Sequence, residues 1–194
     1  MSRQKLSGAE LRERLIAAAI VQVREHGRAG FSLRETARSA GVDPAMVYRQ
    51  FADKDALVES VALRAFAGLA EASREASAAA GDGSRDQLLA LGRTYVRFAR
   101  ERPTEFDLMV PGGRRPAIPT DAPSAYDQLT DLLGRAGDLP LPPDAAALLC
   151  WSTVHGAAAL AASGALAGYL PEAVDPLDLV LVSLVDLIFP AARI

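Results

Sequence analysis

The stretch from Phe31 to Val58 constrains the fold more strongly than any other part of this chain. Its residues predict two short helices joined by a glycine turn, followed by the start of a third helix. Ser32 and Glu35 form a Ser-x-x-Glu pattern, so we expect a capping box that satisfies two unpaired backbone N–H groups of the first helix. Gly41 is expected to adopt the positive φ that a sharp turn after this helix requires.

The second short helix has equally clear start signals. Asp43 is a favourable N-cap residue, and Pro44 suits the first helical position because its missing N–H is not needed there. Val42 and Val47 are spaced to fill the seam between the two helices, and Asp53 is expected to cap the third helix. Two capped helices packed closely around a glycine turn are typical of a helix-turn-helix motif that reads DNA.

Ten residues around the end of the second helix resemble a known family. Val47–Phe51 reads VYRQF and Asp53–Leu57 reads DKDAL, which is similar to the signature of the tetracycline-repressor (TetR) family of bacterial transcription regulators. The resemblance covers residues 8–60 closely and the remainder only in helical layout. It implies an all-α homodimer with DNA-binding domains at one end and ligand-receiving, dimerising domains at the other.

Hydrophobic periodicity also predicts that the chain is all-α. The expected helices cover residues 8–26, 33–40, 44–50, 54–79, 84–102, 106–110, 120–135, 144–167 and 176–191, and residues 111–119 are expected to form a mobile loop. We expect an N-terminal three-helix helix-turn-helix domain over residues 1–53 and a C-terminal helical ligand-binding and dimerisation domain over residues 54–194. The helix at 54–79 is the only element expected to link the two, which makes it the lever between ligand and DNA.

The charges are distributed unevenly along the chain. Residues 1–64 carry 11 Lys and Arg against 8 Asp and Glu, a net charge of +3, whereas residues 65–194 carry 10 against 16, a net charge of −6. A basic N-terminal part attracts phosphates, and an acidic remainder is repelled by them. The only cysteine is Cys150, and residues 1–30 contain no apolar signal segment, so we expect a cytoplasmic protein.

Two apolar segments near the C-terminus predict an interface. Residues 145–170 contain no Asp, Glu, Lys or Arg and are long enough to span a bilayer, but they are rich in Ala and Gly and poor in the residues that drive insertion. Residues 178–189 are apolar on more than one face and must be covered on several sides. We expect both helices of two subunits to form a symmetric four-helix interface, with no membrane involved. The alternative is that they bury only against their own domain.

The expected DNA contacts fall into two groups. Polar side chains that would meet phosphates are Ser32, Tyr48, Gln50 and Lys54, and the family resemblance carries this role most directly onto Tyr48 and Lys54. Side chains that would reach base edges are Arg34, which can pair with guanine, and Pro44 and Ala45, which are placed to contact a thymine methyl group. A solvated surface lysine is the alternative for position 54. Arg38 is expected at either a phosphate or solvent.

Two residues depart from the family pattern. Thr36 occupies a place that usually holds Ile or Val, so we expect slightly looser packing between the helices. Asp43 replaces the more common Ser, and an acidic side chain there is expected to cap the helix rather than to contact a phosphate.

The C-terminal part contains a short pattern of its own. Trp151 and His155 share one helix face, and with Gly156 they resemble the WHG motif of a C-terminal domain found in a subset of these regulators. In such domains a cavity receives small, often hydrophobic molecules. The expected ligand-binding residues are therefore Tyr95, Phe98, Phe106, Met109, Trp151 and His155. The alternative is that these side chains only form a core, because a lone Trp and His on an apolar helix are commonly core residues.

Enzymatic chemistry finds little support in the sequence. There are two histidines, and no phosphate-binding glycine loop, nucleophile elbow or paired-carboxylate pattern. His155 has no Cys or carboxylate at metal-ligand spacing, so neither a metal nor a cofactor is expected. We expect a transcriptional repressor that binds a pseudo-palindromic DNA operator as a homodimer and is released by a small hydrophobic effector. The alternative is an effector-independent helix-turn-helix repressor or an interaction adaptor.

Overall fold

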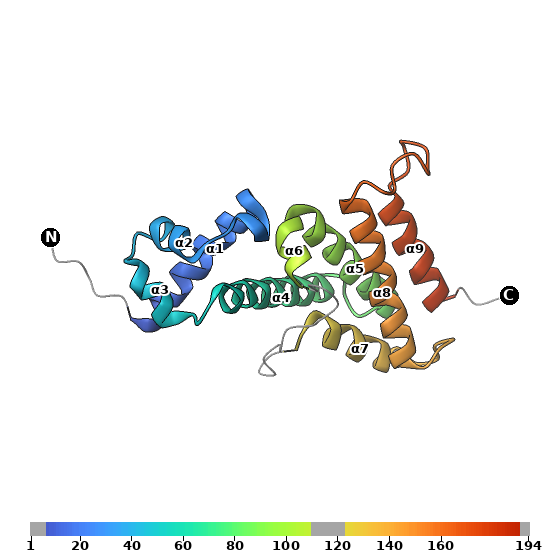
Figure 1. Ribbon diagram of the computed structural model, residues 1–194. Helices are drawn as coiled ribbons and strands as arrows, with labels where there is room; N and C mark the ends of the chain where they lie inside the picture. Colours follow the sequence, from blue (N-terminus) through green and yellow to red (C-terminus); the bar gives the residue numbers. More distant parts are fainter. Residues whose placement is uncertain (1–6, 110–122, 191–194) are drawn as a thin grey trace. The chain divides into compact units, whose positions relative to one another are not determined.

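The computed structural model describes residues 7–109 and 123–190, except for the side chains of residues 28 and 29. Within these residues the chain forms nine helices and no strand, which confirms the all-α prediction (Figure 1). The helices are α1 (Gly8–Gly30), α2 (Leu33–Ser39), α3 (Pro44–Gln50), α4 (Lys54–Ala79), α5 (Ser84–Glu101), α6 (Pro103–Met109), α7 (Ala125–Arg135), α8 (Pro143–Ala162) and α9 (Pro176–Ile188). The loop expected at residues 111–119 lies outside the described residues.

The chain divides into two compact units. The first contains the residues up to Ala65 together with α6 from Thr104 onward, and the second contains Phe66–Pro103 and the helices α7, α8 and α9. Helix α4 contributes residues to both units. The domain boundary expected between residues 53 and 54 coincides with the N-terminus of α4 and stays a prediction.

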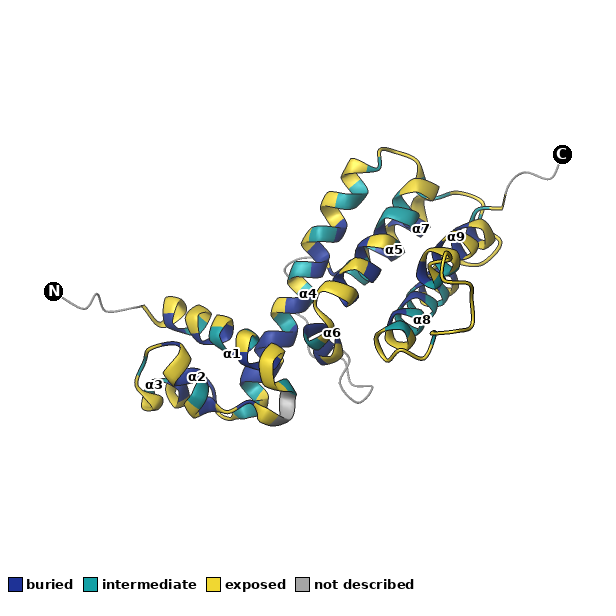
Figure 2. Cartoon of the chain, turned by 90° about the horizontal axis from the view of Figure 1, so that it is seen from above, coloured by how far each residue is buried: buried dark blue, intermediate teal, exposed yellow. Residues whose placement is uncertain are grey.

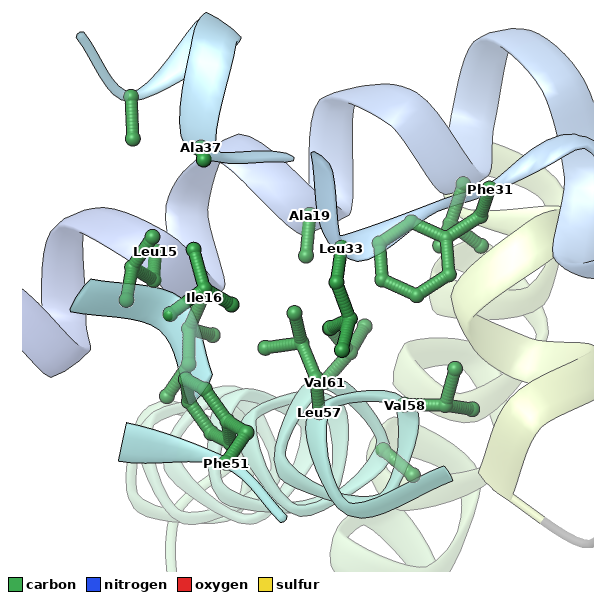
Figure 3. Packing of buried hydrophobic residues seen from close by; sticks show 14 of the residues in the cluster. Leu15, Ile16, Ala19, Phe31, Leu33, Ala37, Phe51, Leu57, Val58 and Val61 are labelled. Carbon is green, nitrogen blue, oxygen red and sulfur yellow. The ribbon is translucent and has the colours of Figure 1, made fainter. Parts of the chain in front are cut away.

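The first unit is built around one apolar core. Side chains from α1, α2, α3 and the first turns of α4 converge there, and Leu108 of α6 joins them (Figure 3). The fully buried members include Leu15, Ala19, Val23, Ala37, Val47, Leu57 and Val61. Because full burial of a Val, Leu or Phe side chain stabilises by about 1.5–3 kcal/mol, this core fixes how the short α2 and α3 pack on α1 and α4.

Helix α1 does not run uninterrupted to its last residue. Gly27 has φ 66° and ψ 177°, so the backbone leaves the helical conformation there and a short additional turn follows. The helix end expected at His26–Gly27 is therefore present as a break, although helical structure resumes as far as Gly30.

The second unit is a helical bundle in which α5 packs against α7, α8 and α9, and α8 packs against α7 and α9. Helices α5 and α9 approach closely at Gly92, where an added Cβ would lie 2.5 Å from Leu181 Cδ2. Three exposed ion pairs follow the same seam: Arg85–Asp186, Arg93–Asp178 and Arg100–Asp175. Figure 2 shows that α8 and α9 also present exposed faces within this unit.

Four expected helix bounds were wrong. Helix α7 begins at Ala125 rather than at residue 120, because Ser124 caps it, and α9 ends at Ile188 rather than at residue 191. Helix α8 ends at Ala162 rather than at residue 167, because Gly164 has φ +75° and the N–H of Ala165 bonds the carbonyl of Leu160, which closes the helix in a Schellman turn. Helix α6 begins at Pro103 rather than at residue 106, so this proline starts the helix instead of following the previous one.

Candidate nucleic-acid interface and effector region

The start of α2 forms half of the expected capping box. The Oγ atom of Ser32 accepts a hydrogen bond from the N–H of Glu35 at 3.2 Å, as predicted. The Glu35 carboxylate does not return to the backbone of Ser32 but pairs with the guanidinium of Arg38 on the helix surface. The hydrogen bonds from Arg38 lower the pKa of Glu35 below its ordinary value. Arg38 is thus held along its own helix, and Arg34 remains an exposed side chain on α2.

The turn between α2 and α3 has the predicted glycine geometry. Gly41 has φ +64°, the N–H of Val42 bonds the carbonyl of Ala37, and the N–H of Gly41 bonds the carbonyl of Arg38. These two bonds define a Schellman motif that satisfies carbonyls at the end of α2. Val42 packs against the same core as Val47, which confirms that the two valines fill the seam.

Thr36 is accommodated without an unsatisfied polar group. Its side chain is completely buried, and its Oγ1 donates a hydrogen bond to the carbonyl of Ser32 at 3.0 Å. Because the hydroxyl makes a hydrogen bond within its own helix, its burial does not leave an unsatisfied donor.

Helix α3 is anchored on one side and exposed on the other. The Asp43 carboxylate accepts a hydrogen bond from the N–H of Ala45 at 2.8 Å, so it caps the helix as predicted. Val47 is fully buried, whereas Pro44 and Ala45 are exposed. Tyr48 is 56% exposed to solvent although its side chain is large and partly apolar.

The beginning of α4 lies close to the end of α3. Asp53 caps it by accepting a hydrogen bond from the N–H of Ala56 at 2.8 Å, as predicted. The Nζ atom of Lys54 lies 5.6 Å from the ring centroid of Phe31, within the range of a cation–π contact. Lys54 and Gln50 are each half-buried.

Sequence reasoning missed two residues that hold the first unit together. Glu105 of α6 has only 5% side-chain exposure, and both of its carboxylate oxygens accept hydrogen bonds from Arg24 of α1, at 2.7 and 2.8 Å. The same bonds raise the pKa of Arg24. The expectation that α4 is the only link to the DNA-reading helices was therefore wrong, because α6 follows α5 of the second unit in the chain and packs within the first.

Arg12 of α1 is the second missed residue. It is half-buried and contacts the C-terminal end of α3. No motif signals such a contact, because it joins residues separated by 38 positions in the chain.

The structure brings three of the six expected effector-binding residues together. The Tyr95 hydroxyl lies 2.8 Å from Nδ1 of His155, and the Trp151 ring stacks at a tilt on the His155 ring with centroids 5.8 Å apart. Tyr126, which sequence reasoning missed, packs edge-on against Trp151 at 5.9 Å. Burial raises the pKa of Tyr95 to about 12, although a hydrogen bond from Trp151 opposes this shift.

The protonation state of this cluster follows from its burial. Desolvation lowers the pKa of His155, which favours the neutral imidazole near pH 7. Nδ1 of neutral His155 can accept a hydrogen bond from the Tyr95 hydroxyl, so the two groups satisfy each other.

The other three expected residues are divided between the two compact units. Phe98 is buried in the second unit, with the Arg102 guanidinium 5.2 Å from its ring centroid. Phe106 and Met109 are buried on α6 in the first unit. A single pocket lined by all six side chains thus stays a prediction.

A shallow groove of about 340 Å³ lies elsewhere on the second unit. It is lined by Arg93, Val96, Arg97, Arg100, Glu101, Asp175, Asp178 and Leu181 of α5 and of the start of α9. This lining is mostly charged and includes none of the expected effector-binding residues. Among the described residues, no group of three His, Cys, Asp or Glu side chains is arranged to hold a metal ion.

A capped helix-turn-helix joined to a helical bundle defines the class of helix-turn-helix transcription regulators. Residues 15–61 match the family described as "Bacterial regulatory proteins, tetR family", and residues 88–184 match "Tetracyclin repressor-like, C-terminal domain". The chain belongs to the TetR family. Members of this family bind DNA and are not enzymes, in agreement with the sequence-based expectation.

Solved structures agree with this assignment. A protein of unknown function from Rhodococcus sp. RHA1 is 30% identical, with 96% of this chain and 95% of that chain covered and a TM-score of 0.77. A tetR-family regulatory protein from Rhodococcus RHA1 is 19% identical (92% and 94% covered, TM-score 0.60), and the fatty acid degradation regulator FadR from Bacillus halodurans is 14% identical (98% and 99% covered, TM-score 0.66). The last two show similarity of fold alone. No protein of curated function matches the chain significantly.

Proposed function

We propose that this TetR-family regulator is a repressor that binds a pseudo-palindromic operator as a homodimer and is released by a small hydrophobic molecule. The observation that carries this proposal is the geometry of α3. Its ends are fixed by Asp43 and by the buried Phe51, Val47 anchors its inner side, and its outer side is exposed. An exposed helix held this rigidly is suited to enter a major groove.

The contacts to phosphates would come from the rim of this helix-turn-helix. Ser32 uses its Oγ as an acceptor within α2, which leaves its hydroxyl proton able to reach a phosphate oxygen. Tyr48 is exposed, and Gln50 and Lys54 are partly exposed. We infer that Lys54 contacts a phosphate, because it lies in the segment that matches the DNA-binding family and its position in the DKDAL sequence resembles the family signature.

Base readout would come from α2 and the start of α3. Arg34 is exposed on α2, and its guanidinium can make two parallel hydrogen bonds to guanine. Pro44 and Ala45 are exposed at the N-terminus of α3, where short apolar groups can approach a thymine methyl group.

Dimerisation would use the exposed apolar faces of α8 and α9. Leu179, Val182 and Leu187 recur at helical spacing on α9 and are 47%, 37% and 58% exposed, while Leu148 and Leu160 of α8 are 54% and 50% exposed. Helices α8 and α9 pack against each other, and large apolar side chains exposed on two neighbouring helices favour a surface that a partner covers. Among the described residues, α8 is also the one helix whose length and apolar composition would suffice to cross a membrane. We infer that a second copy covers it, since its many small residues permit close helix approach.

The effector would bind beside the aromatic cluster of Tyr95, Trp151 and His155. The polar groups of this cluster bond one another, so an entering molecule would be recognised mainly by apolar contact. Release of DNA requires that the effector favour a conformation in which the two α3 helices no longer match the operator. A coupling free energy of about 1–3 kcal/mol would weaken operator binding by roughly 5–150-fold.

Selection of genomic DNA fragments by the purified protein tests this proposal. We expect enrichment of one palindrome, a dimer in sedimentation, and release of that palindrome by at least one member of a panel of apolar metabolites. An enriched palindrome without release by any member would instead favour the effector-independent repressor. No enriched sequence would contradict DNA recognition by α3.

A further inference from the structure

Arg12 joins three helices of the first unit through a single side chain. Its Nη1 atom donates a hydrogen bond to the carbonyl of Gln50, the last residue of α3, at 3.1 Å. Its Nη2 atom donates to the Oγ of Ser60 on α4 at 2.9 Å. The guanidinium carbon also lies 4.4 Å from the centroid of the Phe51 ring, which places the planar group over the aromatic face.

These contacts satisfy a specific need of α3. The helix has only seven residues, and helices this short are not stable in isolation. The last carbonyls of a helix have no intrahelical partner, and the C-terminal end of the helix dipole is negative. A cation that bonds the Gln50 carbonyl and stacks on the buried Phe51 therefore fixes the C-terminal end of α3, as Asp43 fixes its N-terminal end.

The contact with Ser60 connects this fixed end to α4. Ser60 is 7% exposed, and its hydroxyl donates to the carbonyl of Ala56 within α4 at 3.0 Å, so its oxygen accepts the bond from Arg12. The Gln50 carbonyl, the Ser60 hydroxyl and the Phe51 ring cannot all be contacted if α4 shifts relative to α3, because the guanidinium is a rigid planar fork. A displacement of α4 would thus either break a charge-assisted hydrogen bond or move the end of α3.

We propose that Arg12 is a positioning residue that couples the register of α4 to the orientation of α3, so that operator specificity depends on a side chain that does not touch DNA. This inference rests on the proposed function, because it takes α3 as the helix that reads the operator. A direct phosphate contact is the competing role for an arginine here. The two roles differ in salt dependence, because only a phosphate contact releases counterions.

Four variants of the full-length protein separate these roles. Arg12→Gln removes the charge and the fork, Arg12→Lys keeps the charge without the fork, and Ser60→Ala removes only the bond to α4. Arg64→Gln is the matched control, because Arg64 of α4 makes an exposed ion pair with Glu13 of α1 that does not involve α3. Thermal unfolding identifies a temperature at which every variant is folded, and binding to the selected palindrome and to random DNA is measured there over a range of salt.

We expect Arg12→Gln and Arg12→Lys to weaken palindrome binding by about tenfold and Ser60→Ala by about threefold, as losses of charge-assisted hydrogen bonds. Binding to random DNA and the slope of log affinity against log salt should stay unchanged in all of them. Arg64→Gln should remain within about twofold of the wild type on both DNAs.

Two results would overturn the inference. An Arg12→Gln protein with an unchanged ratio of palindrome to random-DNA affinity would show that the end of α3 does not need this clamp. A salt slope reduced by about one in the same variant would show that Arg12 contacts a phosphate instead. If the wild type itself prefers no sequence, the proposed function fails, and that outcome is visible before any variant is compared.

Discussion

Replacement of Gly41 by alanine should destabilise the protein and impair DNA binding together. Gly41 has φ +64°, and an L-residue in this conformation costs about 1–2 kcal/mol. An added Cβ would also lie 3.3 Å from Nη2 of Arg14, so that side chain must move slightly. A loss of about 1–2 kcal/mol in the free energy of unfolding corresponds to a factor of roughly 5–30 in the ratio of folded to unfolded protein.

Gly81 provides the matched control for this substitution. It has φ +79°, but an added Cβ would meet no atom within 4 Å, and it lies between α4 and α5 rather than in the helix-turn-helix. Urea unfolding at a fixed protomer concentration should show a similar loss of stability for Gly41→Ala and Gly81→Ala. Only Gly41→Ala should also weaken operator binding at a temperature where both are folded. Equal stability of Gly41→Ala and the wild type would refute the argument from backbone strain.

Four further predictions concern other residues of the chain. Lys54→Ala should weaken binding to all DNA and reduce the slope of log affinity against log salt by about one. Arg34→Ala should reduce the discrimination at one base pair by about 1–3 kcal/mol. Unchanged DNA titrations of both variants would contradict both contacts. Gln22→Met should leave the free energy of unfolding unchanged or raise it by about 1 kcal/mol, as measured by urea unfolding, because Oε1 of the buried Gln22 has no hydrogen-bond partner among the described residues. A clear loss of stability would show that the hydrogen bond from Gln22 to Ser39 matters more. Burial lowers the pKa of His155 in the folded protein. Its contribution to stability should therefore be present above its ordinary pKa of about 6.5 and be lost as the pH falls through the lower pKa of the folded state. A His155→Gln variant whose free energy of unfolding depends on pH in the same way as that of the wild type would contradict this.

Local features of the helix-turn-helix were predictable because their causes are local. The caps by Asp43 and Asp53 and the turn at Gly41 each involve residues within six positions of one another, and the structure contains all three. The Glu35 side chain was not placed correctly, because two local partners competed for it. Its carboxylate bonds the Arg38 guanidinium instead of the backbone of Ser32, a choice between charged and neutral donors that the Ser-x-x-Glu pattern does not settle.

Contacts between distant residues were not predictable from the pattern. The bonds of Arg12 to Gln50 and of Arg24 to Glu105 span 38 and 81 positions in the chain, and each depends on how the helices pack. In the second unit, the helical spacing of Trp151 and His155 placed them on one face, but their partner Tyr95 lies on another helix. The sequence contains the charged and polar side chains that make such contacts, but it does not show which of them meet.

The most direct test of a dimeric reader is the dependence of affinity on half-site spacing. The selected palindrome would be compared with versions carrying 5 or 10 extra base pairs between its halves. Two α3 helices fixed in one dimer predict a large loss at 5 extra base pairs, which turn one half-site to the opposite face of the DNA, and partial recovery at 10. Equal affinity for all three spacings would contradict the account, because the two reading helices would then bind independently.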